Sequence, residues 1–217
     1  MSGRLIVIEG IDGSGKSTQF DLLRKRLDVD GVMYRYMRFP RYSEDSSRLV
    51  KMYLGGEFGG DAGKINPYIA SVFYAYDRAE AFKDELGDFY RDGGVLLLDR
   101  YTTANAVHQG AKLEGDARGE FSDWLFDFEY NRLGLPRPAA VILLDMPVEI
   151  ARRLIGSRGG AADIHEKDGE FLRRSAESAR YMAGKYGWAR INCGTGGNPR
   201  SPEDIAAEVF LAAKKVI

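Results

Sequence analysis

The stretch Gly10-Ile11-Asp12-Gly13-Ser14-Gly15-Lys16-Ser17 decides the fold, because it matches the phosphate-binding pattern G-x-x-x-x-G-K-[ST]. It follows the apolar run of residues 4–9 and precedes a segment with Phe20, Leu23 and Leu27 at helical spacing. A strand, a glycine-rich loop and a helix in this order are the context in which the pattern binds phosphate. The alternative is a purely structural glycine-rich turn with a serine that caps a helix.

The residue types in this loop suit a nucleotide with magnesium. Glycines let consecutive backbone N–H groups approach a phosphate, and the start of the helix adds donors and partial positive charge. We expect Lys16 to reach the β- and γ-phosphates of ATP and the Ser17 hydroxyl to bind Mg²⁺. The residues expected to contact the nucleotide are Gly10, Asp12, Gly13, Ser14, Gly15, Lys16, Ser17 and Thr18.

Strand-length apolar runs alternate with longer segments of helical period along the chain. The expected strands are residues 5–8, 32–37, 95–98, 141–144 and 188–192, and the expected helices are residues 17–27, 67–90, 118–134, 147–156, 168–186 and 202–215. Runs without polar alternation are typical of parallel strands covered on both faces. The sequence therefore predicts an α/β fold of the P-loop NTPase type: three layers, with helices on both faces of a five-stranded parallel sheet.

Length and composition limit the function classes. The 217 residues suit a single domain over residues 1–217, and 31 Lys and Arg against 32 Asp and Glu give a net charge of −1. Proteins that bind nucleic acid or anionic membranes usually carry a basic excess, so we expect neither partner. Cys193 is the only cysteine, and no apolar run is long enough to span a bilayer. These features favour a soluble protein of the cytoplasm.

Asp99 and Arg100 directly follow the apolar run of residues 95–98. The carboxyl edge of a parallel sheet is where ligands bind, so Asp99 is expected to hold Mg²⁺ through water and Arg100 to neutralise a phosphate. The alternative is a solvent-exposed ion pair at the end of a strand. The guanine-reading tetrapeptide Asn-Lys-x-Asp does not occur in the chain, which argues against a GTPase.

Four motifs in order resemble the thymidylate kinase family over nearly the whole chain. They are the loop Glu9-Gly10-Ile11-Asp12-Gly13-Ser14-Gly15-Lys16-Ser17-Thr18, the pair Phe39-Pro40, the triplet Asp99-Arg100-Tyr101, and the stretch Leu144-Asp145-Met146-Pro147-Val148-Glu149-Ile150-Ala151-Arg152-Arg153. The resemblance implies transfer of the γ-phosphate of ATP to dTMP with Mg²⁺, which gives dTDP and ADP. It also implies a homodimer and a mobile lid at about residues 152–168.

The resemblance assigns roles at the substrate base and sugar. Asp12 matches a family acid that faces the 3′-hydroxyl, while Tyr74 and Arg78 match the aromatic that stacks on thymine and the arginine that reads O4. Spacing is consistent with a shared face for this pair, because Ile69, Val72, Phe73 and Tyr76 form the expected buried stripe of the same helix. The alternative is an exposed aromatic–arginine pair.

Other matches concern the phosphate and the sugar. Phe39, Arg41 and Tyr42 stand where many relatives read Phe-Pro-x-Arg, so Arg41 is expected to reach the substrate phosphate although Tyr42 occupies the matching position. Asn105 matches a family asparagine on the base or phosphate side. His108 stands where relatives carry an aromatic that crowds the 2′ position, and both packing and a substrate contact remain open for it.

The catalytic cation is expected in the lid. Some thymidylate kinases carry an arginine inside the P-loop, where this chain has Gly13, so the resemblance implies the type with a basic lid. Arg158 lies within the glycine-rich residues 156–163 and is the first candidate, followed by Arg153 and then by Arg152. The predicted catalytic set is Lys16, Asp99, Arg100 and Arg158.

Three rival functions remain open from the residues. Another P-loop nucleotide kinase, such as one for CMP or UMP, would share the phosphate loop. A deoxynucleoside kinase needs a carboxylate base near the 5′-hydroxyl, whereas Phe39-Pro40-Arg41 offers a cation there. A regulatory P-loop protein would bind nucleotide with little turnover and would lack a closing arginine.

Overall fold

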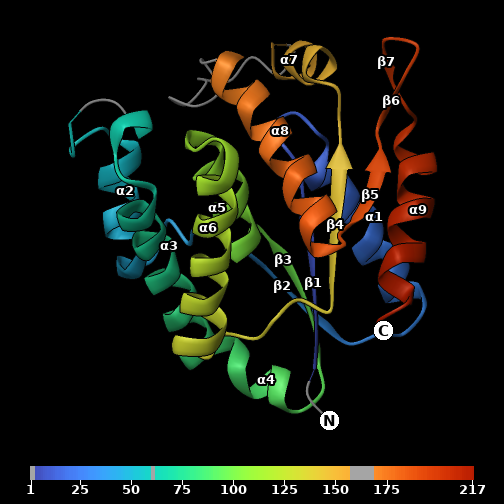
Figure 1. Ribbon diagram of the computed structural model, residues 1–217. Coiled ribbons are helices and arrows are strands. Elements are labelled where there is room, and N and C mark those ends of the chain that lie inside the picture. The colour runs from blue at the N-terminus through green and yellow to red at the C-terminus, as the bar shows by residue number, and fades with distance from the viewer. Residues whose placement is uncertain (1–2, 60–61, 157–168) are drawn as a thin grey trace.

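The structure, a computed structural model, describes residues 3–59, 62–156 and 169–217. At its centre lies a five-stranded parallel sheet with the strand order β2-β3-β1-β4-β5 (Figure 1). The strands are β1 (Arg4–Glu9), β2 (Tyr34–Arg38), β3 (Val95–Asp99), β4 (Ala140–Asp145) and β5 (Ala189–Asn192). The predicted α/β class and all five expected strands are confirmed.

Helices cover both faces of this sheet, as predicted (Figure 1). One face packs against α1 (Lys16–Val29) and α9 (Pro202–Lys214), and the other against α3 (Pro67–Ala81), α5 (Thr102–His108), α6 (Gly115–Phe126) and α8 (Gly169–Tyr186). The remaining helices are α2 (Arg48–Leu54), α4 (Gly87–Arg91) and α7 (Val148–Gly156). Among the described residues, no helix is long and apolar enough to cross a membrane.

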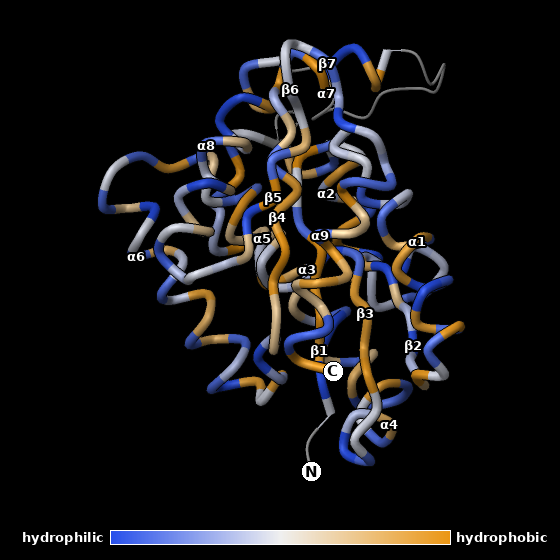
Figure 2. Tube along the Cα trace, turned by 90° about the vertical axis from the view of Figure 1, so that its right-hand side faces the viewer, coloured by the Kyte–Doolittle hydropathy of each residue, from blue (hydrophilic) through white to orange (hydrophobic). Residues whose placement is uncertain are grey.

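The two faces of the sheet are both apolar because alternate residues of the central strands enter different cores. Ile6 and Ile8 of β1 pack with α1 and α9, whereas Leu5 and Val7 pack with the helices of the opposite layer. Figure 2 shows hydrophobic colour along β1, β3 and β4 in the middle of the molecule. This double burial explains why the strands read as continuous apolar runs in the sequence.

Local signals fix the starts of two long helices. The Asn66 side chain accepts hydrogen bonds from the backbone N–H groups of Tyr68 and Ile69, and Pro67 occupies the first turn of α3. Ser201 accepts from the backbone N–H of Asp204 ahead of α9, which begins with Pro202. Both pairs combine a side-chain cap with a proline whose missing N–H costs nothing at this position.

Two expected helices are longer composites in the structure. The chain of α3 runs into a π-helical segment, Phe82–Leu86, and then into α4, while α6 runs into the π-helical segment Asp127–Arg132. Both transitions lie inside ranges that the sequence predicts as single helices, residues 67–90 and 118–134. The wider turn changes which side chains face inward, and helical periodicity gives no sign of it.

The predicted buried stripe of α3 is wrong. Ile69, Val72 and Tyr76 are 55%, 42% and 57% exposed, whereas Asp77 and Arg78 are buried. The inner face of this helix consists of small side chains (Ala70, Ser71, Ala75 and Ala81) and of Asp77 and Arg78, which form ion pairs with other segments. The larger apolar side chains Ile69, Val72 and Tyr76 lie on the outer face. Hydrophobic periodicity therefore indicated the wrong side of the helix.

Candidate active site

The P-loop joins β1, the central strand, to α1. Gly10, Gly13 and Gly15 all have positive φ values, of 155°, 79° and 87°, which L-residues rarely adopt. The Lys16 ammonium folds back over the loop and donates to the backbone oxygens of Gly10 (2.6 Å) and Ile11 (3.0 Å). The loop thus places a nearly buried cation at the carboxyl edge of the sheet, where the strand order reverses on either side of β1.

Gly13 is also a contact point between the P-loop and α7. A Cβ added to Gly13 would lie 2.6 Å from the backbone oxygen of Ala151 and 2.9 Å from Cγ1 of Ile155. Real Cβ atoms essentially never approach backbone so closely. The absence of a side chain therefore lets the helix that leads toward residues 157–168 pack directly on the loop.

Arg100 lies at the centre of a charged cluster beside the P-loop. It is the one non-glycine residue of the described chain with positive φ, 66°, a strained conformation that aims its side chain toward the loop after β1. Its Nη2 donates to Asp12 Oδ1 (2.6 Å), and its Nη1 lies 2.9 Å from Nε2 of His108. Burial alone would raise the pKa of Asp12, but Arg100 and Lys16 hold it well below its usual range.

Glu9 ends β1 beneath this cluster and is buried. Burial raises the pKa of its carboxyl to about 7, although a hydrogen bond from Thr103 and the charges of Arg100 and Lys16 oppose the shift. The Thr103 hydroxyl donates to Glu9 Oε1 at 2.6 Å, which ties the end of β1 to α5. This second carboxyl was not predicted as a site residue.

Asp99 is the residue predicted to hold Mg²⁺, and it lies at the end of β3. Its carboxylate is buried at the end of β3; Oδ2 lies 3.5 Å from Nε of Arg38, and Oδ1 has no hydrogen-bond partner among the described residues. A buried carboxylate oxygen without a donor is suited to a water molecule or a cation. Ser17, in the first turn of α1, offers a hydroxyl to the same kind of ion, and Mg²⁺ commonly takes few protein ligands.

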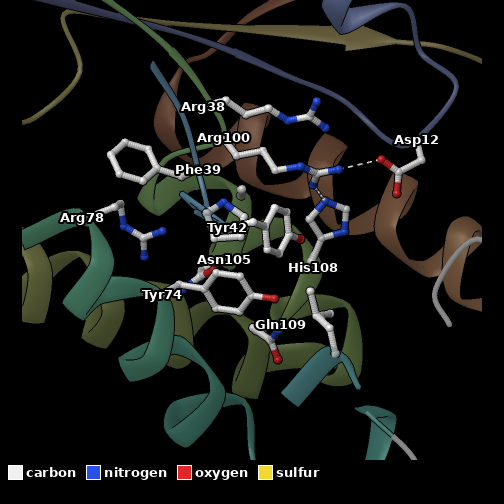
Figure 3. A pocket seen from close by; sticks show the side chains of 13 residues that line it. Asp12, Arg38, Phe39, Tyr42, Tyr74, Arg78, Arg100, Asn105, His108 and Gln109 are labelled. Atoms are coloured by element: carbon white, nitrogen blue, oxygen red, sulfur yellow. Dashed lines mark hydrogen bonds and ion pairs between the residues drawn. The ribbon is translucent and has the colours of Figure 1, made fainter. Parts of the chain in front are cut away.

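A cavity opens beside the Asp12–Arg100 cluster (Figure 3). Its lining residues come from the P-loop, the segment after β2, α2, α3, the end of β3 and α5: Asp12, Arg38, Phe39, Pro40, Tyr42, Leu54, Tyr74, Arg78, Arg100, Ala104, Asn105, His108 and Gln109. Figure 3 shows Asp12, Arg100 and His108 at one end and Arg78 at the other. The cavity therefore has a charged end beside the P-loop and a distant end against α3.

Arg78 is neutralised at the distant end. Its Nε and Nη2 donate to the two carboxylate oxygens of Glu129, at 2.8 Å and 2.6 Å, and both residues are buried. Tyr74, on the same helix, packs edge-to-face on Tyr53, with ring centroids 6.2 Å apart. This end presents an aromatic ring and an arginine whose charge is balanced.

The family model for thymidylate kinase matches residues 8–194. The chain belongs to the thymidylate kinase family. The probable thymidylate kinase of Pyrococcus horikoshii is 35% identical over 214 residues, which cover 99% of this chain and 97% of that protein. The thymidylate kinase of Mycobacterium tuberculosis is 33% identical over 190 residues, which cover 85% of this chain and 87% of that one.

A solved structure supports the fold. The thymidylate kinase of Candida albicans superposes with a TM-score of 0.74 at 19% identity, over 99% of this chain and 92% of that one. Together with the family match, this makes the chain a P-loop enzyme that transfers the γ-phosphate of ATP to dTMP and yields dTDP and ADP.

For this thymidylate kinase, the structure brings most predicted substrate residues to one cavity, but not Arg41. The Arg41 guanidinium is held by Asp77 (3.0 Å), Glu80 (2.9 Å) and Glu85, and its side chain is only 9% exposed. The expectation that Arg41 faces the substrate phosphate needs correction, because three carboxylates hold it outside the cavity lining. Arg38, at the end of β2, lines the cavity instead and was missed.

Gln109 is another cavity residue that was not predicted from the sequence. Its Nε2 donates to the Tyr53 hydroxyl at 3.3 Å, while its buried Oε1 finds no partner in the described part of the chain. Asn105, which was predicted, donates through Nδ2 to the backbone oxygen of Ser71 at 3.3 Å. Gln109 follows Asn105 by four residues along α5 and its continuation, so helical spacing could have suggested it.

The first two candidates for the lid cation have different outcomes. Arg158 lies outside the described residues, as does most of the expected lid. Arg153, the second candidate, lies in α7, and its Nη2 donates to the backbone oxygen of Gly197 in the turn between β6 (Gly194–Thr195) and β7 (Asn198–Pro199). In this arrangement Arg153 ties α7 to the β6–β7 hairpin, so Arg158 remains the predicted catalytic cation.

Proposed function

We propose that dTMP binds in the cavity with its phosphate at the Asp12–Arg100 end and its thymine at the Tyr74–Arg78 end. The observation that carries this orientation is the charge distribution. At the P-loop end the lining has two arginines, Arg38 and Arg100, against one carboxylate, Asp12, whereas Glu129 balances Arg78 at the far end. A dianionic phosphate is attracted to the first end, and a neutral base suits the second.

Catalysis rests on positioning and charge neutralisation, without a covalent intermediate. Lys16 binds the β- and γ-phosphates of ATP together with the N–H groups of Gly10, Gly13, Ser14, Gly15, Ser17 and Thr18. Arg100 bridges toward the substrate phosphate, while Asp12 orients Arg100 and faces the 3′-hydroxyl. This division is supported by the contact of Arg100 with Asp12 and by the position of Lys16 over the loop.

Mg²⁺ is held by the hydroxyl of Ser17 and, through water, by Asp99. The unpartnered Oδ1 of Asp99 among the described residues supports this assignment. The ion supplies positive charge to the phosphate oxygens of ATP when bound. Removing either side chain should reduce the extent to which Mg²⁺ strengthens ATP binding. The fold should stay intact.

Thymine is recognised by stacking and by hydrogen bonds along its edge. Tyr74 stacks on the ring and Arg78 donates to O4. Oε1 of Gln109, which has no hydrogen-bond partner among the described residues, accepts a hydrogen bond from N3–H. Phe39 and Tyr42 line the cavity next to the sugar. Asn105 also lines the cavity, and its hydrogen bond to the backbone of Ser71 links α5 to α3. His108 restrains Arg100 beside the sugar, which gives this residue a role in packing and in positioning.

Residues 1–217 act as one kinase domain with a lid at about residues 152–168, from which Arg158 closes over the β–γ bridge of ATP. We assign the enzyme to the cytoplasm, where ATP is available and the buried thiol of Cys193 stays reduced.

The enzyme is a homodimer in this proposal, with the outer face of α3 at the interface. Ile69, Val72 and Tyr76 are all exposed on that face, which favours burial against another copy. Val72→Glu should convert the dimer into monomers in a light-scattering measurement of mass. A mass that stays dimeric would place the interface elsewhere.

The decisive experiment measures ADP release with dTMP, dCMP, UMP and thymidine in parallel. We expect dTMP to give the highest kcat/KM, and thymidine to give no turnover because it lacks the phosphate that Arg100 binds. A preference for thymidine would favour a nucleoside kinase, and a preference for UMP or dCMP another nucleotide kinase. ATP binding without ADP release from any of the four would favour a regulatory P-loop protein.

A further inference from the structure

The contact between α3 and the π-helical segment Asp127–Arg132 is built around one carboxylate. Glu129 Oε1 accepts from Nη2 of Arg78 (2.6 Å), and Oε2 accepts from Nε of Arg78 (2.8 Å) and from the hydroxyl of Thr102 (2.7 Å). Glu129 is 0% exposed and Arg78 is 1% exposed. Three charge-assisted hydrogen bonds therefore fix this carboxylate from two different helices.

The fork geometry decides which part of Arg78 reaches the cavity. A guanidinium is planar, so two bonds from Nε and Nη2 to one carboxylate fix both its position and its plane. Nη1 takes no part in that pair, and Arg78 lines the cavity (Figure 3). Its two N–H groups thus form a donor edge whose direction is set by Glu129.

The pair also removes net charge from one end of the cavity. Without Glu129, Arg78 would be a third cation in the lining, besides Arg38 and Arg100. A cation at each end would attract the substrate phosphate in two orientations. With Glu129 in place, the attraction is confined to the P-loop end.

We propose that Glu129 is a positioning residue that sets the choice of thymine over cytosine by holding Arg78. This inference rests on the proposed orientation of dTMP. Thymine presents an acceptor, O4, at the position where cytosine presents an amino group. The fixed N–H groups of Arg78 can donate to O4, but they find no acceptor in the amino group of cytosine and stay unpaired. If Arg78 can turn, the mismatch with cytosine is relieved and discrimination falls.

The test is steady-state kinetics of Glu129→Gln with dTMP, dCMP and dUMP. Glutamine keeps the shape and one acceptor oxygen but removes the charge and one of the fork bonds. We expect the dTMP-to-dCMP ratio of kcat/KM to fall about tenfold, or ~1.4 kcal/mol. The dTMP-to-dUMP ratio should stay unchanged, since both bases carry O4.

Asp77→Asn is the matched control. Asp77 lies on α3, as Arg78 does, and is a buried carboxylate that neutralises another arginine, Arg41. Arg41 does not line the cavity. This variant should lower thermal stability and leave both substrate ratios unchanged. In an Arg78→Ala background, Glu129→Gln should cause no further loss of discrimination, because the residue acts through Arg78.

Thr102→Val provides a second variant if Glu129→Gln does not fold. It removes one hydrogen bond to Oε2 and leaves the ion pair, so the dTMP-to-dCMP ratio should fall in the same direction by a smaller factor. Equal losses with all three substrates, or unchanged ratios in folded Glu129→Gln or Thr102→Val, would overturn the positioning role. Wild-type enzyme without preference for dTMP would instead refute the proposed function on which it rests.

Discussion

The two ends of the substrate cavity use arginine in opposite ways. At the P-loop end, Arg100 contacts the carboxylate of Asp12 through one nitrogen and the ring of His108 through another. A second arginine, Arg38, lines the same end of the cavity. At the α3 end, Arg78 is matched by one buried carboxylate, Glu129, in a two-bond fork. The P-loop end therefore provides positive charge, and the α3 end provides hydrogen-bond donors whose direction is fixed.

This difference separates attraction from selection. A phosphate is bound by cations with little demand on angle, whereas a base is chosen by donors and acceptors whose position is fixed. Mutations at the two ends should consequently change different kinetic quantities.

Lys16→Ala should have the largest effect and should leave selection untouched. Loss of the cation over the P-loop is expected to lower kcat by about 10³-fold for every monophosphate. The dTMP-to-dCMP ratio should remain that of the wild type, because Lys16 lies outside the cavity lining. Near-normal turnover would remove the assignment of this loop to phosphoryl transfer, with circular dichroism as the check that the fold is intact.

Arg100→Ala and Arg78→Ala test the separation itself. The first should lower kcat/KM about 100-fold for dTMP, dCMP and dUMP alike, since it removes charge at the phosphate. The second should raise the KM for dTMP and lower the dTMP-to-dCMP ratio about tenfold. Parallel rate measurements decide, and identical selectivity profiles would show that the two ends do not have separate roles.

Arg38 and Arg41 provide a sharper comparison within one segment. Arg38→Ala should raise the KM for dTMP about fivefold, the effect of losing one cation at a partly exposed position. Arg41→Ala should leave the KM unchanged and lower the melting temperature, because three carboxylates lose their shared partner. An increase in KM for Arg41→Ala alone would restore the role expected from the sequence.

The smallest expected effect is a pH dependence of stability due to Glu9. Its pKa is raised from 4.5 to about 7 in the folded protein, so the folded state holds this proton more tightly than the unfolded chain does. The contribution to stability is therefore present below pH 4.5 and is lost as the pH rises toward 7. Between pH 5 and pH 6 the loss should be about 1 kcal/mol.

Urea unfolding of the wild type and of Glu9→Gln at both pH values measures this contribution. The difference in unfolding free energy between the two proteins should change by that amount. A constant difference would mean that Glu9 is ionised over this range in both states.

The fold and half of the site could be predicted from the sequence for physical reasons. The strands are buried on both faces and so form continuous apolar runs, and the P-loop and Asp99–Arg100 follow two of them directly along the chain. By contrast, α5 was not predicted, because residues Thr102–Val107 are all buried and show no amphipathic period. The same helix carries Asn105 and His108, which only the family resemblance indicated.

The ion-pair partners of individual arginines could not be predicted. Arg38 and Arg41 stand three residues apart, and what distinguishes them is the group of carboxylates on and after α3 that surrounds only one. Glu129 is 51 residues from Arg78 and faces it from a π-helical turn. Such pairings depend on the packing of distant segments, so local sequence patterns contain no signal for them.

Gly13 restricts how this enzyme could acquire an arginine in its P-loop during evolution. Its φ of 79° and the close approach of Ala151 and Ile155 leave no room for a side chain at this position. An arginine at this position would therefore need more than one substitution, because α7 would also have to lie farther from the loop. A single Gly13→Arg change would displace α7, because Ala151 and Ile155 occupy the space that the new side chain needs. An arginine in this loop and the close packing of α7 on it therefore exclude each other, and gaining the first would require compensating substitutions in α7.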